Sequence, residues 1–310
     1  MRNRSGGLRF ILGFFYLVAL GPIGVIGSIA AAGQLPQALR YNQVQWKASH
    51  NSYAQPTDIL SQLRDYRIRS IEFDLHVSQG KLIEKEPAPA GDFLVFHTAN
   101  NAHSNCRILS QCFDQVAAFH QGQPDHEVIT IFFDMAGVGE AGHTKADLYK
   151  VFQTKLTPAS IFTPGDLLRA CPGAQSLQES VTRPGCGWPL LSDLQGKVIL
   201  VVSDGRDDII KAGYDLRQDL LFLVSKNTDP GRMREDPNLV FFNLAGPRNS
   251  ISVFKDAGFV TRSYWLNTEK AFLQAKRLGA NHLATDRIDP KLYPWSGTQD
   301  QAGHPFQKIE

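Results

Sequence analysis

Two histidines and three carboxylates stand within or directly after the first apolar runs of this 310-residue sequence. His50 and His97 each follow such a run, and imidazole is the side chain that most readily exchanges a proton near neutral pH. Glu72 and Asp74 lie two positions apart, so in a strand both point to the same face. Asp134 ends a later run. This combination predicts proton-transfer chemistry beside a cluster of negative charge.

Carboxylates placed this closely repel one another unless a cation or a proton lies between them. The amide oxygen of Asn51 would complete an all-oxygen shell with Glu72, Asp74 and Asp134, and such a shell suits Ca²⁺ or Mg²⁺ rather than Zn²⁺. We expect calcium rather than magnesium, because calcium is plentiful outside the cytoplasm and fills even a weak site there.

The elements that must position these residues are short apolar runs bounded by turn residues, which span 44–48, 69–75, 93–96, 128–133, 197–202, 239–244, 258–261 and 281–285. Segments with helical spacing lie between most of them, at 58–66, 112–121, 145–156, 208–224 and 268–278. The longest connection, 135–196, would hold one helix and an irregular region. Continuous apolar strands alternating with helices indicate a parallel sheet covered on both faces. Eight such units predict an α/β fold with a single (β/α)₈ TIM-type barrel.

In a barrel of this kind the carboxyl ends of the strands meet at one mouth. Every one of the eight expected ends carries polar residues, which are His50-Asn51, Glu72, Asp74 and His76, His97, Asp134, Ser203-Asp204, Asn243, Arg262 and Tyr264, and Asp286. We therefore expect one active site at this mouth. The sequence leaves open whether His76 supports the site or only the fold.

The N-terminal segment looks like an export signal. Three arginines precede an uncharged stretch, 10–32, that ends in three alanines, which predicts a signal peptide cleaved before Gly33. The stretch is also long enough to serve as an uncleaved membrane anchor, but its glycines weaken a continuous helix and favour cleavage. In both cases residues 33–310 form the barrel domain and lie outside the cytoplasm, secreted or periplasmic.

Four cysteines form two local pairs, Cys106 with Cys112 and Cys171 with Cys186, and an oxidising compartment would let both pairs bridge. The formal net charge of +2 becomes −1 without the three leader arginines. The rest of the chain therefore lacks the excess of basic residues that is typical of nucleic-acid-binding proteins. The sequence has no P-loop, no Gly-x-Ser-x-Gly elbow and no dinucleotide-binding glycine motif, which argues against nucleotide binding and serine-hydrolase chemistry.

Three segments resemble the calcium-dependent phosphatidylinositol-specific phospholipase C family, a group of PLC-like phosphodiesterases with a TIM barrel. They are 48–53 (Ala-Ser-His-Asn-Ser-Tyr), 70–76 (Ser-Ile-Glu-Phe-Asp-Leu-His) and 95–97 (Val-Phe-His). The resemblance implies that His50 and His97 are catalytic. It implies calcium ligation by the set Asn51, Glu72, Asp74 and Asp134.

The resemblance also bears on the substrate. Relatives that cut polyphosphorylated inositides carry lysines after the fifth strand, whereas the end expected here, 201–206, has none. Arg262-x-Tyr264 resembles the Arg-x-Tyr of those enzymes, with the tyrosine ring stacking on inositol and the arginine reaching a phosphate or hydroxyls. With Ser203 and Asp204, these residues are the expected substrate contacts. We expect a phosphoinositide, preferably unphosphorylated on its ring, or another glycerophosphodiester, met transiently at a membrane surface.

The implied reaction is attack of the inositol 2-hydroxyl on phosphorus, giving a cyclic inositol phosphate and diacylglycerol. His97 would protonate the leaving oxygen. His50 would act as the base or stabilise the equatorial oxygens of the phosphoryl group, and Glu72 could take the role of base instead. Three alternatives stay open: a glycerophosphodiester phosphodiesterase, a sphingomyelinase D-like enzyme, and an inactive barrel that binds lipid headgroups or a partner. The first of these normally has Arg where this chain has Asn51.

Overall fold

The computed structural model describes residues 38–77, 88–98, 101–136, 143–203, 205–226 and 228–310. The expected signal segment, 1–32, and Asp204 lie outside the described residues. The signal segment and the domain boundary at 32/33 therefore stay predictions. None of the helices within the described ranges is long and apolar enough to cross a membrane.

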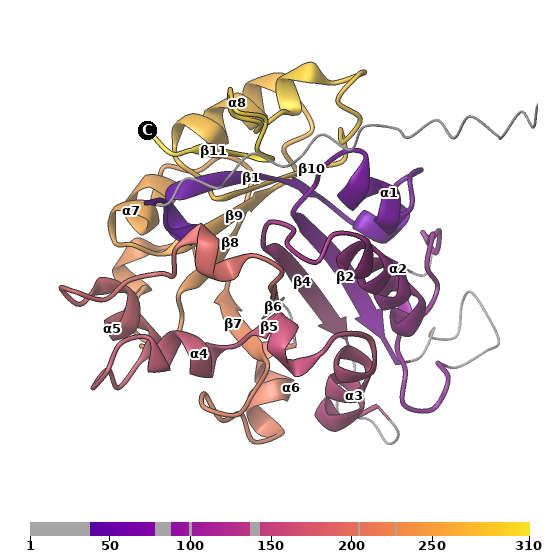
Figure 1. The fold of residues 1–310 in the computed structure, drawn as a ribbon, viewed down its shortest axis with the longest axis horizontal. Coiled ribbons are helices and arrows are strands. Elements are labelled where there is room, and N and C mark those ends of the chain that lie inside the picture. Colours follow the sequence, from indigo (N-terminus) through magenta and orange to yellow (C-terminus); the bar gives the residue numbers. More distant parts are fainter. Residues whose placement is uncertain (1–37, 78–87, 99–100, 137–142, 204, 227) are drawn as a thin grey trace, which may run out of the picture. The chain divides into compact units, whose positions relative to one another are not determined.

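Eight parallel strands close into a barrel, because each pairs with the next and the last pairs with the first (Figure 1). In chain order they are β1 (Val44–Ser49), β2 (Ser70–His76), β4 (Ile129–Ala136), β6 (Val198–Val202), β7 (Leu221–Ser225), β8 (Phe241–Ala245), β9 (Val260–Tyr264) and β10 (His282–Thr285). The single (β/α)₈ barrel expected from the sequence is confirmed.

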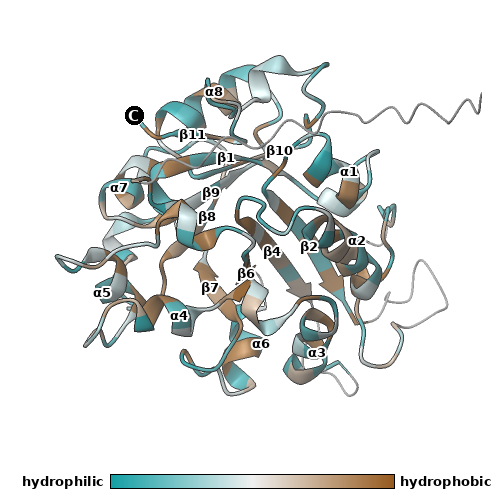
Figure 2. Ribbon diagram, viewed as in Figure 1, coloured by the Kyte–Doolittle hydropathy of each residue, from teal (hydrophilic) through white to brown (hydrophobic). Residues whose placement is uncertain are grey.

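Helices connect the strands and lie around them (Figure 1). They are α1 (Ile59–Arg64), α2 (Leu109–Gly122), α3 (Lys145–Lys155), α4 (Pro164–Arg169), α5 (Leu177–Thr182), α6 (Arg206–Lys211), α7 (Ser250–Asp256) and α8 (Glu269–Arg277). Several begin at a side-chain cap: Asp58, Thr144 and Thr268 accept the amide hydrogen three residues ahead in α1, α3 and α8. Figure 2 shows hydrophobic residues concentrated along β4, β6 and β7, whose described residues pack into the core.

Two strand assignments from the sequence were wrong. The run 93–96 contains only β3 (Leu94–Val95), which pairs antiparallel with the end of β2 and stays outside the barrel. The third barrel strand is therefore β4. The missing strand is β7, which lies inside the expected helix 208–224; only α6 at its start is helical. A short continuous apolar run such as 220–224 fits a buried strand or a buried helix equally, so periodicity could not separate them.

The connection between β4 and β6 holds more structure than expected. Besides α3, which matches the expected helix, it contains the short strand β5 (Ile161–Phe162) and the helices α4 and α5. The Cys171–Cys186 disulfide lies in this connection, and the Cys106–Cys112 disulfide lies at the start of α2. Both expected cysteine pairings are confirmed. A last strand, β11 (Phe306–Lys308), pairs antiparallel with β1 and stays outside the ring.

Candidate active site

Three carboxylates meet at the carboxyl ends of β2 and β4. Asp74 and Asp134 are direct partners in the β2–β4 pairing, and Glu72 precedes Asp74 by two residues, so all three point to one face. One oxygen from each of the three carboxylates lies within 4.8 Å of the others. The barrel therefore brings together the three acidic residues that the sequence singled out.

The negative charges of this cluster disfavour the ionised form of Asp74, a buried residue that is 7% exposed. Burial and the negative charges of Glu72 and Asp134 raise its pKa to about 6, against the opposing hydrogen bond from His97. Among the described residues, its buried Oδ1 atom has no partner of ordinary hydrogen-bond geometry, although the Tyr53 hydroxyl is near enough to oppose the rise in the pKa of Asp74. A buried carboxylate oxygen that lacks a well-placed donor, in a group of oxygen ligands, fits a hard cation such as Ca²⁺. The residues present therefore fit the expected metal.

Asn51 lies in the turn between β1 and the 3₁₀ turn Ser52–Ala54, with a left-handed φ of 46° that asparagine tolerates better than most residues. Its backbone N–H donates to Glu72 Oε2 at 2.9 Å. The hydroxyl of Ser52 accepts the backbone N–H of Glu72 at 2.8 Å. This turn is thus tied to the carboxylate cluster through the Asn51 backbone and the Ser52 hydroxyl.

Glu72 is also paired with Arg262 of β9, whose Nη2 lies 2.6 Å from Glu72 Oε2. Burial raises the pKa of Glu72, but the positive charges of Arg262 and His50 outweigh burial and bring that pKa below its usual value. Glu72 is therefore held as a weakly basic carboxylate. Arg262 itself is 1% exposed, so a substrate contact would require it to leave this pair.

His50 follows β1, and its Nδ1 donates to Asp286 Oδ1 at 2.9 Å. Asp286 follows β10 and also accepts a hydrogen bond from the Asn267 amide through its other oxygen. Burial raises the pKa of Asp286, but the hydrogen bonds from His50 and Asn267 outweigh it and lower the pKa overall. Tyr264 stacks parallel to the His50 ring, with 6.0 Å between centroids. His50 is thus oriented with Nε2 available for chemistry.

His97 is held in the same way by a different carboxylate. Its Nδ1 donates to Asp74 Oδ2 at 2.9 Å, and its side chain is 44% exposed. The hydrogen bond to Asp74 raises the pKa of His97 despite partial burial. His76 stacks on Phe96, with 4.0 Å between ring centroids, and bonds the Phe96 carbonyl. His76 therefore supports the segment that carries His97.

Asp134 is contacted from the two barrel strands that follow β4. The hydroxyl of Ser203, after β6, donates to Asp134 Oδ1, and Lys226 Nζ, after β7, lies 3.6 Å from the same oxygen. Because β6 is the fourth barrel strand and β7 the fifth, the expectation that no lysine follows the fifth strand was wrong. Sequence reasoning missed Lys226 since it placed β7 within a helix.

Sequence reasoning also missed Asp286 as the partner of His50 and Asn267 as the partner of Asp286. Asp286 had appeared only as one of the polar strand ends, and 236 positions separate it from His50. The position of Asp286 directly after the last strand could have predicted this contact, because the first and last strands of a closed barrel are neighbours.

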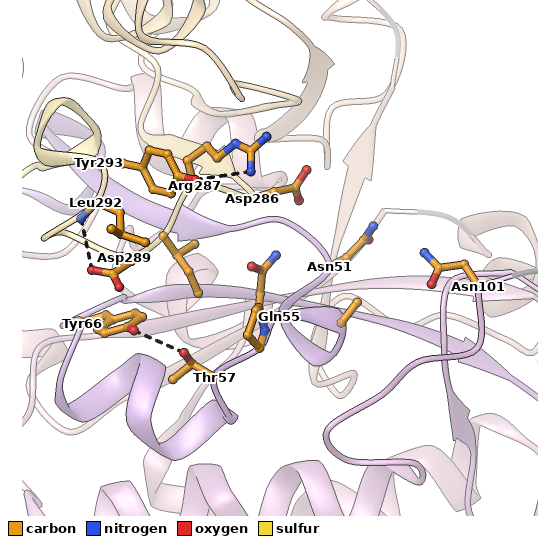
Figure 3. Close-up of a pocket in the computed structure, with 13 residues that line it drawn as sticks. Asn51, Gln55, Thr57, Tyr66, Asn101, Asp286, Arg287, Asp289, Leu292 and Tyr293 are labelled. Carbon is orange, nitrogen blue, oxygen red and sulfur yellow. Dashed lines mark hydrogen bonds between the residues drawn. The ribbon is translucent and has the colours of Figure 1, made fainter.

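A cavity of about 520 Å³ adjoins the site, with Asn51 and Asp286 in its wall. Figure 3 shows Asp286, Arg287 and Tyr293 on one side, Thr57 and Tyr66 on the other, and Gln55 between them. The segment after β10 forms part of the cavity wall. The buried Lys47 ammonium holds this segment by donating a hydrogen bond to the Ile288 carbonyl at 2.7 Å. The cavity is therefore preformed and mixed in polarity.

Compared by sequence, the chain matches no family profile and no curated protein. Compared by structure, it is similar to a calcium-dependent phosphoinositol-specific phospholipase C from Pseudomonas sp. In one form of that enzyme, bound to myoinositol, the identity is 21%, covering 81% of this chain and 92% of that one, with a TM-score of 0.67. In another crystal form the identity is 20%, the coverage is 88% and 96%, and the TM-score is 0.69.

A calcium-dependent phosphatidylinositol-specific phospholipase C from Streptomyces antibioticus is similar as well, at 18% identity over 80% of this chain and 94% of that chain, with a TM-score of 0.61. At these identities the likeness establishes the fold. The chain therefore has the barrel fold of the calcium-dependent phosphatidylinositol-specific phospholipases C.

Proposed function

We propose that this protein is a calcium-dependent phosphodiesterase of the phospholipase C type. The observation that carries the proposal is the pair His50 and His97, each oriented through Nδ1 by its own carboxylate, next to one carboxylate cluster. Two oriented imidazoles beside a cation site are the groups that phosphodiester cleavage requires: a base, an acid and a stabiliser of negative charge. We further propose phosphatidylinositol or a related phosphodiester as the substrate.

The calcium ion would be held by Glu72, Asp74, Asp134 and the Asn51 amide oxygen. When bound, it would neutralise negative charge that develops on the phosphoryl oxygens and acidify the attacking hydroxyl. We favour calcium over magnesium, because the oxygens come from fixed protein groups, whereas magnesium usually keeps several waters.

His50 is the proposed base, and its Nε2 takes the proton of the inositol 2-hydroxyl as that oxygen attacks phosphorus. Glu72 suits this step less well, because its pKa is lowered and Arg262 holds one of its oxygens. His97 is the proposed acid. The hydrogen bond to Asp74 raises the pKa of His97, which favours the protonated imidazole that can donate to the departing glycerol oxygen. The products are a cyclic inositol phosphate and diacylglycerol.

The headgroup would lie between Tyr264 and the cavity beside Asn51 and Asp286. The tyrosine ring offers an apolar face, and the cavity offers amide, hydroxyl and charged groups to a polyol. Ser203, which contacts Asp134, stays a candidate contact, and so does Asp204, which lies outside the described residues. In this proposal the membrane supplies the lipid transiently, and neither nucleotide nor nucleic acid takes part.

The test compares two substrates that differ only in the leaving group. General acid or base assistance is worth about 10²–10⁴-fold. His97→Ala should lower kcat by that order on the natural lipid, but much less on an analogue with an acidic phenol leaving group, which departs without a proton. His50→Ala should be equally damaging on both substrates. His120→Gln, at the opposite end of the barrel, is the matched control and should keep activity.

Equal losses for His97→Ala on both substrates would show that His97 is not the acid. Product analysis by ³¹P NMR, with and without chelator, separates the alternatives. A cyclic inositol phosphate that disappears on chelation supports the proposal. Release of glycerol 3-phosphate from glycerophosphodiesters would indicate a glycerophosphodiester phosphodiesterase. No turnover of any diester would indicate a binding protein.

We also propose an extracytoplasmic location. The two disulfides support it, because disulfides persist in oxidising compartments. Mass spectrometry of exported protein should find a mature N-terminus near Gly33. An intact Met1 in the membrane fraction would instead favour the uncleaved anchor.

A further inference from the structure

Arg262 is a buried cation in the wall of the proposed metal site. Its side chain is 1% exposed, and Nη2 lies 2.6 Å from Glu72 Oε2. Its Nη1 donates to Asn243 Oδ1 at 3.0 Å. Asn243 lies on β8, the strand next to β9, whereas Glu72 lies on β2, which does not pair with β9. The guanidinium is therefore buried and held beside the carboxylate cluster from two separate strands.

Two aromatic rings also lie close to the Arg262 guanidinium. The Arg262 Cζ atom lies 5.1 Å from the centroid of Phe132 and 5.5 Å from that of Tyr264. A cation is attracted to the faces of such rings, and the two polar neighbours, Glu72 and Asn243, add to the positions that hold the guanidinium. The position of Arg262 is thus set by four neighbours, and only one of them is a carboxylate.

Glu72 is held at one oxygen by a hydrogen bond and an ion pair. Its Oε2 receives the Asn51 backbone N–H at 2.9 Å and faces Arg262. A divalent cation among Glu72, Asp74 and Asp134 would therefore share the charge of Glu72 with a guanidinium that cannot move away. Two positive charges on one carboxylate repel, and their coupling is felt equally by both partners.

We infer that Arg262 is a positioning residue that holds Glu72 in the metal-free protein and, as a permanent counter-charge, weakens calcium binding at the carboxylate cluster. The site then fills only where calcium is abundant, as it is outside the cell. This inference rests on the calcium site of the proposed function, but not on the identity of the substrate.

Lys226 provides a comparison within the same site. Its Nζ lies 3.6 Å from Asp134 Oδ1, but its side chain is 38% exposed. Solvent screens this charge, and a flexible lysine can turn away when a cation arrives. Neutralising Lys226 should therefore alter calcium affinity less than neutralising Arg262.

The experiment is a calorimetric titration of the metal-free protein with calcium chloride, on the wild type and three variants. Arg262→Met removes the charge and keeps an unbranched side chain, and we expect calcium to bind about tenfold more tightly or better, within the usual range of such couplings. Arg262→Lys keeps the charge, and its affinity should stay within about threefold of the wild type. Lys226→Met should tighten binding by less than Arg262→Met does.

The inference is overturned if Arg262→Met binds calcium no more tightly than the wild type, or if Arg262→Lys changes affinity as much as Arg262→Met. If the wild type binds calcium and Arg262→Met binds it with the same affinity, this inference alone is overturned. A wild type that binds no calcium removes the metal from the proposed function and the inference with it.

Arg262→Met leaves a buried carboxylate without its partner, so the variant could unfold without metal. Thermal unfolding at increasing calcium concentration then gives the same information, because tighter binding raises the midpoint more steeply. We expect a steeper rise than in the wild type. A variant that stays unfolded at saturating calcium contradicts the inference, which requires calcium to replace Arg262 as the counter-charge.

Discussion

Replacing Asp74 with asparagine should stabilise the calcium-free protein. The folded structure raises the pKa of this buried carboxyl from 3.8 to about 6, first through burial and then through the charges of Glu72 and Asp134. Since one pH unit in pKa corresponds to about 1.4 kcal/mol, ionised Asp74 costs the folded state about 3 kcal/mol at pH 8. Asparagine has nearly the same shape, carries no charge, and its carbonyl can still accept the His97 hydrogen bond.

The pH dependence follows from the sign of the shift. A carboxyl whose pKa is raised on folding destabilises the native state above the folded pKa, and the penalty is lost as pH falls toward the unfolded value. The advantage of Asp74→Asn should thus be full at pH 8, about half as large at pH 5, about a fifth as large at pH 4 and nearly absent by pH 3.

The assay is thermal unfolding in a chelator, where a gain of about 3 kcal/mol corresponds to roughly 6 °C for a barrel of this size. Asp256→Asn, whose side chain is 72% exposed, is the control and should change stability by less than about 0.5 kcal/mol. Added calcium should raise the midpoint of the wild type but not that of Asp74→Asn. A variant less stable than the wild type at pH 8 in chelator, or an advantage that stays undiminished at pH 4, would refute the reasoning.

Three other predictions concern the histidine partner, the metal and the disulfides. Asp286→Asn should lower kcat by about 10²-fold or more with little change in KM, because His50 loses the carboxylate that orients it; a loss below about threefold in steady-state kinetics would contradict that role. Calcium affinity should fall about tenfold for each pH unit below about 6, where Asp74 gains a proton that calcium must displace; calorimetry showing constant affinity down to about pH 5 would argue against Asp74 as a ligand. Replacing Cys171 and Cys186 together with serine should destabilise the fold by about 3 kcal/mol in denaturant unfolding, since the disulfide closes a 15-residue loop; an unchanged unfolding midpoint would show that the bridge does not form.

Local features of the chain were sufficient for much of the fold and for the chemistry of the mouth. The period of a strand is two, so Glu72 and Asp74 had to share a face wherever β2 lay. Apolar runs alternating with helical segments pointed to a barrel because both faces of a parallel sheet must be covered. The pairing of Cys106 with Cys112 followed from their short separation. Each of these conclusions depends on residues close together in sequence.

Partners that are distant in sequence were decided by the closed barrel. The run that became β7 could form a strand or a helix, and pairing with β6 and β8 selected the strand, which brought Lys226 to the mouth. The sequence placed Arg262 at the same mouth but could not show that its charge would be buried against Glu72.

The partner of His50 was decided in the same way. Asp286 reaches His50 because β10 closes the ring against β1. The sequence thus predicted most of the polar groups at the mouth, with Lys226 as an exception, whereas the tertiary structure alone decided which carboxylate pairs with which positively charged side chain. Those pairings follow from barrel closure and burial, which no local pattern encodes.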